Sequence, residues 1–340
     1  MASSRVTLRD IAEEVGVNPS TVSRALNPKT RGMVTGEIAR QITEAADRMG
    51  YRPNPFAYSL RTNRSFTVGV LVPDLTNPAF APIIKGIDNV LEASGYSVMV
   101  ANTDNVAERE RRNVAKFRER HVDGLVIATA RRHDPLIDEC RAEGTPLVLA
   151  VRRTTNSGIS SVVSDEVTGG ETIVSHLAQL GHRRVACIAG PQELSTGFER
   201  HQGYVRGLNA NNLEYDAGLV EFCDAFTEEE GRRAASRLLA SGRDFTAIVA
   251  ANDMIAIGIY DELQTKGLVC GRDISVVGYD DMLFSSKFDP PLTTMHSPLL
   301  DIGAEAARIL LEQIEDPETP PRSVKMTPEL ILRKSTGKPA

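Results

Sequence analysis

The sequence has few features of a secreted, metal-binding or membrane-spanning protein. Its four cysteines are far apart, and none has a second cysteine or a histidine at metal-ligand spacing. No stretch approaches the roughly 18 uninterrupted apolar residues that a membrane span requires, and the first residues lack the apolar core of an export signal. We therefore expect a cytoplasmic chain that holds no metal and no cofactor, with buried free thiols at Cys140, Cys187, Cys223 and Cys270.

Signatures of common α/β enzymes are also missing. There is no G-x-G-x-x-G or Walker phosphate loop, no G-x-S-x-G nucleophile elbow and no paired-histidine zinc motif. We therefore expect no enzymatic activity. A metabolic enzyme with an accessory helical head is one alternative, which turnover of a nucleoside or a sugar phosphate would support. A solute receptor for transport is another, but it would need the export signal.

Charge is unevenly distributed along the chain. The whole chain carries 39 Lys and Arg against 45 Asp and Glu, a balance that by itself argues against a nucleic-acid partner. Residues 1–64 reverse it with 10 basic and 6 acidic side chains, which leaves 29 basic and 39 acidic for the other 276 residues. A basic head on an acidic body predicts that only the head contacts a polyanion.

The head, residues 5–50, has the pattern of three short helices. Thr7 to Asp10 has the spacing of a capping box, and Asn18 followed by Pro19 is a typical helix start. A third helix is expected from Thr35 to Met49. Two short helices joined by a glycine-containing turn favour a helix-turn-helix, whose second helix enters the DNA major groove. A three-helix protein-interaction module is the alternative.

The second helix carries the predicted base contacts. Val22 is expected to point to the core, which leaves small hydroxyl groups and one arginine on the open face. Hydroxyl groups reach phosphates and base edges at short range, and arginine can form a bidentate contact with guanine. The DNA contacts predicted from this pattern are Ser20, Thr21, Ser23 and Arg24.

The body, from residue 66 onward, alternates short apolar runs with amphipathic stretches, which predicts parallel α/β sheets. The pattern restarts after Ser164, so we expect two similar doubly wound lobes rather than one sheet. Helices are expected at 79–93, 168–180 and 254–266. Strands are expected at 68–72, 97–101, 124–128, 146–151, 185–189, 247–250 and 274–278.

Motifs along the whole chain resemble those of the lactose-repressor (LacI/GalR) family of bacterial regulators. Individually these strings are weak, but in this order they are specific. The resemblance implies a ligand-responsive repressor that binds a palindromic operator as a dimer. The motifs are Val6 to Ala12, Gly16-Val17, Thr21 to Asn27, Gly50 to Asn54, Asn77 to Phe80, Val122 to Leu125, Leu180-Gly181-His182, Ala251-Asn252-Asp253 and Ile274 to Asp281.

For the linker, residues 51–65, the resemblance implies a hinge helix from Asn54 to Arg61 that docks in the minor groove. Leu60 lies at the position that wedges between base pairs and bends the DNA. Ala57 lies where the hinge helices of a dimer pack together. A plain interdomain linker is the alternative. Further DNA contacts implied by the family are Thr7, Pro19, Asn27, Tyr51 and Asn54.

For the body, the resemblance implies a periplasmic-binding-protein-like core that holds a small effector between its lobes. The N-terminal lobe would comprise residues 66–163 plus 296–324, and the C-terminal lobe residues 164–295 plus 325–340. Phe80 would be a stacking platform and Arg200 the principal hydrogen-bond donor, although an ion pair with Glu199 or Asp224 is the alternative for Arg200. The implied effector contacts are Asn77, Phe80, Arg200, Asn252 and Asp280.

Two departures from the family pattern limit this transfer. Val151 stands where many sugar-binding relatives place an aspartate, and loss of that anionic acceptor argues against a simple hexose. A sugar-like or nucleoside-like effector remains the expectation. In the head, Pro19 and Ser20 replace longer base-reading side chains, so the operator sequence does not transfer.

Two substitutions test the DNA-binding prediction. Replacing Arg24 should weaken operator binding by roughly 1–3 kcal/mol if its guanidinium contacts a base. Leu60→Ala should reduce operator bending, because alanine is too short to separate two base pairs. Gel shifts on linear and circularly permuted operator fragments measure both effects, and unchanged mobility for both variants would contradict the assignment.

Overall fold

The computed structural model describes residues 6–27, 30–52 and 64–339. It divides into two compact units, Met1–Ser65 and Phe66–Ala340, which we treat separately as the head and the body. The predicted hinge positions Asn54, Ala57 and Leu60 lie outside the described residues. No helix of the described segments is long and apolar enough to cross a membrane.

Local hydrogen bonds set the helices of the head, as the sequence predicts. The Thr7 side chain accepts a hydrogen bond from the Asp10 amide, and the Asp10 carboxylate accepts one from the Thr7 amide at 2.8 Å. Asn18 caps the second helix by accepting from the Ser20 amide at 2.9 Å. The helices are α1 (Leu8–Val15), α2 (Pro19–Leu26), the short 3-10 turn η1 (Arg31–Met33) and α3 (Gly36–Arg48).

Helices α1, α2 and α3 enclose one small apolar core. Gly16 adopts a left-handed conformation with φ of 71°, which turns the chain between α1 and α2. Val22 is fully buried, so the opposite face of α2 is open. The buried core consists of Ile11, Ala12, Val22, Ala25, Ala39, Ile42, Ala45 and Ala46.

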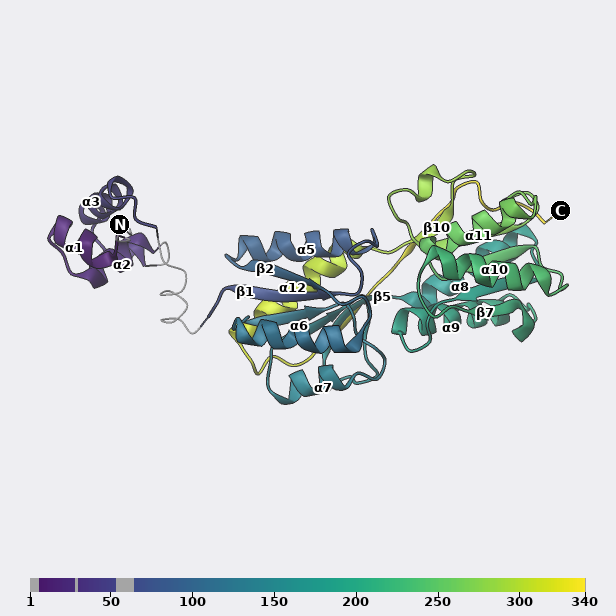
Figure 1. The fold of residues 1–340 in the computed structure, drawn as a ribbon, viewed down its shortest axis with the longest axis horizontal. Coiled ribbons are helices and arrows are strands. Elements are labelled where there is room, and N and C mark those ends of the chain that lie inside the picture. Colours follow the sequence, from purple (N-terminus) through teal and green to yellow (C-terminus); the bar gives the residue numbers. More distant parts are fainter. Residues whose placement is uncertain (1–5, 28–29, 53–63, 340) are drawn as a thin grey trace. The chain divides into compact units, whose positions relative to one another are not determined.

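The N-terminal lobe of the body is a six-stranded sheet covered on both faces (Figure 1). Helices α5 and α12 pack on one face, and α6 and α7 on the other. Its strands, in the order β11-β5-β4-β3-β1-β2, are all parallel. The elements are β1 (Thr67–Val72), α5 (Phe80–Ala93), β2 (Ser97–Asn102), α6 (Ala107–Glu119), β3 (Gly124–Ile127), α7 (Pro135–Ala142), β4 (Leu147–Ala150), β5 (Ser160–Ser164), α12 (Leu299–Glu315) and β11 (Ser323–Met326).

The C-terminal lobe repeats this architecture with the strand order β12-β10-β9-β8-β6-β7. Helices α8 and α9 cover one face and α10 and α11 the other, while β12 runs antiparallel to β10. The elements are α8 (Glu166–Leu180), β6 (Val185–Ala189), α9 (Ser195–Ala210), η2 (Ala217–Leu219), β7 (Val220–Phe222), α10 (Glu228–Ala240), β8 (Ala247–Ala250), α11 (Asp253–Thr265), β9 (Ser275–Asp280), η3 (Ser285–Lys287), β10 (Thr293–His296) and β12 (Glu329–Ile331).

All seven predicted strands are present, and five further strands were not predicted: β5, β7, β10, β11 and β12. Strand pairing also moves two predicted lobe boundaries. Lys325 and Met326 pair with β5 of the N-terminal lobe, so the crossing near residue 324 comes after Met326. His296 pairs with Asp280 of the C-terminal lobe, so the crossing predicted at residue 295 comes after His296.

Glycines allow α5 and α12 to pack closely. A Cβ atom on Gly86 would lie 2.0 Å from the backbone oxygen of Leu300, and one on Gly303 would lie 2.2 Å from the backbone oxygen of Ile83. Backbone atoms cannot move aside as a flexible side chain can, so only glycine fits at both positions.

Gly86→Ala should therefore lower the free energy of unfolding of the body by about 1–3 kcal/mol, because the added methyl group forces the two helices apart. Thermal and urea unfolding measure the change. Gly36→Ala, in the head, is a negative control that should leave unfolding of the body unchanged, since a Cβ there meets nothing within 4 Å. An unchanged melting temperature for Gly86→Ala would contradict the packing described above.

Candidate functional site

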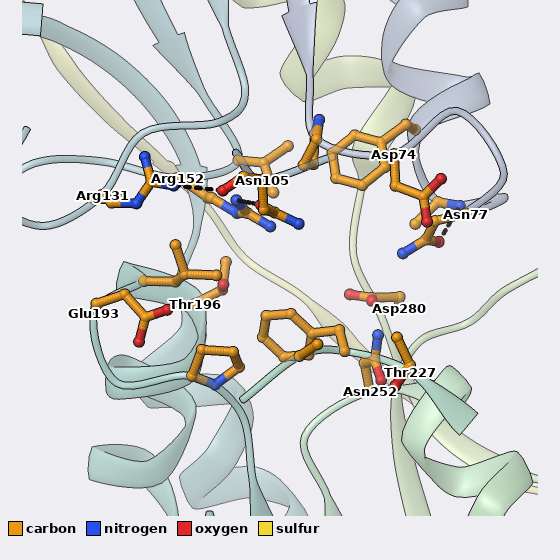
Figure 2. A pocket seen from close by; sticks show the side chains of 18 of the residues that line it. Asp74, Asn77, Asn105, Arg131, Arg152, Glu193, Thr196, Thr227, Asn252 and Asp280 are labelled. Carbon is orange, nitrogen blue, oxygen red and sulfur yellow. Dashed lines mark hydrogen bonds between the residues drawn. The ribbon is translucent and has the colours of Figure 1, made fainter. Parts of the chain in front are cut away.

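A cavity of about 360 Å³ lies between the two lobes of the body (Figure 2). Its lining comes mainly from the loops that follow the carboxyl ends of the parallel strands, where open α/β sheets bind ligands. The N-terminal lobe contributes residues after β1 to β4, and the C-terminal lobe contributes residues after β6 to β9. Its volume suits a small metabolite.

The structure brings together all five residues predicted as effector contacts, because Asn77, Phe80, Arg200, Asn252 and Asp280 all line this cavity. Figure 2 shows Asp74 and Asn77 facing Asn252 and Thr227 across it. The side-chain amides of Asn77 and Asn252 are held in place by hydrogen bonds at the starts of α5 and α11. Asn77 accepts from the Ala79 amide at 3.0 Å, and Asn252 accepts from the Ile255 amide at 2.9 Å.

Arg200 is held inside the protein by two carboxylates. Its guanidinium donates to Glu166 at 2.7 and 3.2 Å, and to Asp280 at 2.8 Å. It also donates to the backbone oxygen of Ala251 at 2.7 Å. Burial alone would lower the pKa of Arg200, but the two carboxylates outweigh it and raise the pKa. The guanidinium is therefore charged, and four of its hydrogen bonds are already made to the protein.

This arrangement changes the expected role of Arg200. Neither Glu199 nor Asp224 pairs with it, although both were considered from the sequence; Glu166 and Asp280 do instead. The ring of Tyr279 lies 3.8 Å below the guanidinium carbon. Arg200 thus fixes the position of Asp280 at the cavity wall, and little of its donor capacity is left for a ligand.

Arg152 is a site residue that the sequence reasoning missed. Its side chain is 4% exposed and lines the cavity, where one guanidinium nitrogen donates to Asn105 Oδ1 at 2.8 Å. Within the described segments no carboxylate forms an ion pair with it. Burial, reinforced by the charge of Arg131, lowers the pKa of Arg152 to about 10. A hydrogen-bond acceptor placed beside it would be strongly favoured.

The backbone at Val151 directs Arg152 into the cavity. Val151 has φ of 67°, and the Arg152 amide donates to the oxygen of Ala150 at 2.7 Å, which closes a three-residue turn. A β-branched residue in this region is strained by about 1–3 kcal/mol. Asp280, at the opposite wall, has φ of 98°. Strained residues of this kind cluster at ligand sites.

Two aromatic rings give the cavity apolar faces. Phe80 begins α5 and is 6% exposed, and Phe226 follows β7 in the other lobe. Gly190 permits this position of Phe226, since a Cβ on Gly190 would lie 2.4 Å from the ring. No sequence pattern indicated Phe226, because the three-residue strand β7 before it is too short to predict. Thr196 and Thr227 add hydroxyl groups nearby (Figure 2).

The head places the predicted DNA contacts in two groups. Pro19, Ser20 and Arg24 are exposed on α2, whereas Thr21, Ser23, Asn27 and Tyr51 are half-buried. The hydroxyl group of Thr7 donates to the Asp10 carboxylate at 2.9 Å, so this side chain also caps α1. Across the described segments, no group of three or more His, Cys, Asp or Glu side chains is placed to hold a metal ion.

Two family models match the chain. One, described as bacterial regulatory proteins of the lacI family, matches residues 7–54. The other, described as periplasmic binding proteins and sugar binding domain of LacI family, matches residues 65–334. Together they cover the head and nearly the whole body.

Relatives and solved structures agree with these models. HTH-type transcriptional repressor PurR of Vibrio atlanticus (strain LGP32) is 31% identical over 330 residues, or 97% of this chain and 98% of the relative. HTH-type transcriptional repressor CytR of Escherichia coli (strain K12) is 32% identical over 332 residues, or 97% and 96%. The structure of the lac repressor dimer bound to operator and the anti-inducer ONPF has a TM-score of 0.85 at 27% identity, covering 98% of this chain and 100% of that one.

Arg200→Ala should lower the free energy of unfolding of the body by about 3–5 kcal/mol, because it leaves Glu166 and Asp280 buried without a counter-charge. Calorimetry measures the loss. Arg206→Ala is the control: its ion pair with Glu171 spans 3.8 Å and is exposed, so its removal should change stability by less than about 1 kcal/mol. Equal effects of the two variants would contradict the assigned role of Arg200.

Proposed function

The chain belongs to the LacI family of bacterial regulatory proteins, as its motifs predicted, and is a ligand-responsive DNA-binding regulator. We propose that it is a repressor, without enzymatic activity, that binds a palindromic operator as a dimer in the cytoplasm. The named relatives are transcriptional repressors, and the lac repressor neighbour is a dimer on operator DNA. These likenesses support the proposal.

We propose that the open face of α2 contacts the operator bases. Ser20 in its first turn and Arg24 in its last turn are exposed polar side chains, and the head that carries them has 10 Lys and Arg against 6 Asp and Glu in residues 1–64. Arg24 would provide the bidentate base contact, since Pro19 and Ser20 are too short to reach far into the groove. That Leu60 bends the DNA at the minor groove is a proposal that rests on the family resemblance alone.

We further propose that the effector is a nucleoside-like molecule rather than a simple hexose. The observation that carries this proposal is the joint placement of Arg152, Phe80 and Phe226 around one cavity. Aromatic faces suit a flat ring, and Arg152 suits a carbonyl or another acceptor on its edge. The free side of Asp280, with Asn252 and Thr227, suits hydroxyl groups. Val151 supplies no carboxylate for a further hydroxyl group.

The switch follows from the position of this cavity. A ligand held by Arg152 of one lobe and Asn252 of the other binds best in the interlobe arrangement that brings both walls to it. It thereby shifts the balance of lobe arrangements and, through the linker, the affinity for operator. The two affinities are linked by one coupling free energy, about 1–3 kcal/mol in typical systems. Release of operator by the effector is the form that we propose.

A thermal-shift screen with nucleosides, purine and pyrimidine bases, ribose, cellobiose and hexose phosphates tests this proposal. We expect a nucleoside or base to raise the melting temperature of the body, because a ligand stabilises the state that it binds. The compound should also weaken operator binding by the full chain. Residues 65–340 alone should keep the thermal shift and lose operator binding.

Several results would contradict the proposal. Stabilisation by hexoses alone would refute the effector class, and turnover of any compound would favour an enzyme. Sequence-independent DNA binding that no compound changes would refute the switch. Arg152→Gln should reduce the thermal shift without changing operator affinity in the absence of ligand.

A further inference from the structure

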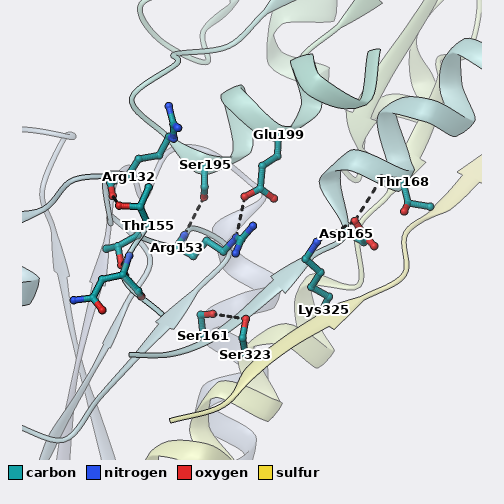
Figure 3. A network of polar contacts seen from close by, with 12 residues as sticks. Arg132, Arg153, Thr155, Ser161, Asp165, Thr168, Ser195, Glu199, Ser323 and Lys325 are labelled. Carbon is teal, nitrogen blue, oxygen red and sulfur yellow. Dashed lines mark hydrogen bonds and ion pairs between the residues drawn. The ribbon is translucent and has the colours of Figure 1, made fainter. Parts of the chain in front are cut away.

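A second cavity of about 480 Å³ lies at the junction of the two lobes. Arg132, Arg153 and Lys325 line it from the N-terminal lobe, and Asp165, Ser195 and Glu199 line it from the C-terminal side (Figure 3). Every charged side chain that lines this second cavity has a hydrogen-bond or ion-pair partner on the protein.

We call the first cavity, lined by Arg152 and Asn252, the effector cavity. Three chain segments line both cavities: the loop after β3, the loop after β4, and α9. Each segment presents neighbouring residues to the two cavities. Arg131 and Arg152 line the effector cavity, and the residues directly after them, Arg132 and Arg153, line the second cavity. In α9, Thr196 and Arg200 line the effector cavity, whereas Ser195 and Glu199 line the second. A displacement of any of these segments therefore alters both cavities.

Arg153 makes two contacts across the lobe junction. Its amide donates to the hydroxyl oxygen of Ser195 at 2.9 Å, and its Nε donates to Glu199 Oε1 at 2.8 Å. Both acceptors lie in the first two turns of α9. The Glu199 side chain is 9% exposed and that of Arg153 37% exposed, so solvent only partly screens the pair.

Arg132, in the loop after β3, also contacts the N-terminal end of α9. Its amide donates to the backbone oxygen of Glu193 at 2.8 Å, and its guanidinium donates to that of Gln192 at 3.3 Å. The guanidinium carbon lies 3.5 Å above the ring of Phe198. Together the two arginines join the loops after β3 and β4 to the start of α9.

We infer that Arg153 and Glu199 are positioning residues that hold the lobes in the arrangement in which the effector cavity is formed. The contacts exist only while the loop after β4 abuts α9, so rotation of one lobe must break them. An effector bound to Arg152 and Thr196, one residue from Arg153 and Ser195, favours the same arrangement. The pair therefore sets how much of the closing free energy the effector must supply, an inference that rests on the proposed effector site.

Amide hydrogen exchange on the full chain, without DNA or ligand, tests this inference. The Arg132 amide bonds across the junction to Glu193, so its exchange reports opening of the lobes. The Thr155 amide bonds to Arg132 within the N-terminal lobe and serves as an internal control. The measurement needs no effector. The inference can therefore be refuted while the proposed function stands, and the proposed function can be refuted while the inference stands.

We expect Arg153→Gln and Glu199→Gln each to speed exchange at Arg132 by about fivefold or more, with little change at Thr155. Because the two side chains act as a pair, the double variant should match the single ones rather than multiply their effects. Arg153→Lys, which keeps the charge, should recover most of the protection. Arg206→Gln is the matched control, since Arg206 and Glu171 line the same cavity but both belong to the C-terminal lobe.

The inference is overturned by unchanged exchange at Arg132 in both single variants, by multiplicative effects in the double variant, or by an equal effect of Arg206→Gln. Faster exchange at Arg132 and Thr155 alike would also overturn it, since that result indicates general destabilisation rather than opening of the lobes.

Discussion

The cavity that we propose for the effector depends on one buried ion network, in which Arg200 holds Glu166 and Asp280. The network ties α9 to the first residue of α8 and the end of β9, and so fixes the wall that the C-terminal lobe presents to a ligand. Removing these charges from water is costly, and the network is stable because every group finds a partner. Because the network is rigid, Asp280 already has a fixed position before a ligand binds, and binding does not include the entropic cost of ordering its side chain.

Each lobe holds ligand-facing residues in fixed positions, which explains how a small ligand can change the arrangement of the two lobes. The strand-end loops of the N-terminal lobe carry Arg152, and α9 of the other lobe carries Thr196, so a ligand that contacts both senses the angle between the lobes. Arg153 directly follows Arg152, and Glu199 lies about one turn beyond Thr196 in α9, so the contact between Arg153 and Glu199 depends on the same angle without a ligand. Ligand and protein contacts thus bias one and the same equilibrium.

The sequence predicted those parts of the fold that local patterns determine. Thr7 and Asn18 cap their helices because hydrogen bonds over two or three residues need no tertiary context. Apolar strands such as β3 were predicted because a short run of apolar residues is itself a local pattern. Strands β5 and β10 were missed because they bury serine and threonine, whose hydroxyl groups bond to distant residues: Ser160 to Gln313, and Thr294 to Asp253. Strand β7 lies at a sheet edge, where a long apolar run is not required.

The candidate site divides in the same way. Asn77, Asn252 and Asp280 lie in motifs shared with the family, so the family resemblance could indicate them, and all three line the cavity. Neither the partners of Arg200 nor the burial of Arg152 could be predicted, because both depend on contacts between segments far apart in the chain. Glu166 and Asp280, for example, are separated from Arg200 by 34 and 80 residues.

Val151 stands where the family resemblance implies an aspartate, and the surrounding structure shows what this difference does to Arg152. A carboxylate at this position would lie next to Arg152 and could neutralise it; valine cannot, and it also holds a strained backbone conformation that a β-branched residue disfavours. The chain therefore keeps a buried guanidinium whose remaining donors face the cavity. Leaving such donors unpaired is unfavourable, so the free energy gained when a ligand acceptor pairs with them is large. An effector with an acceptor edge uses this gain, whereas one that offers only hydroxyl donors at this point does not.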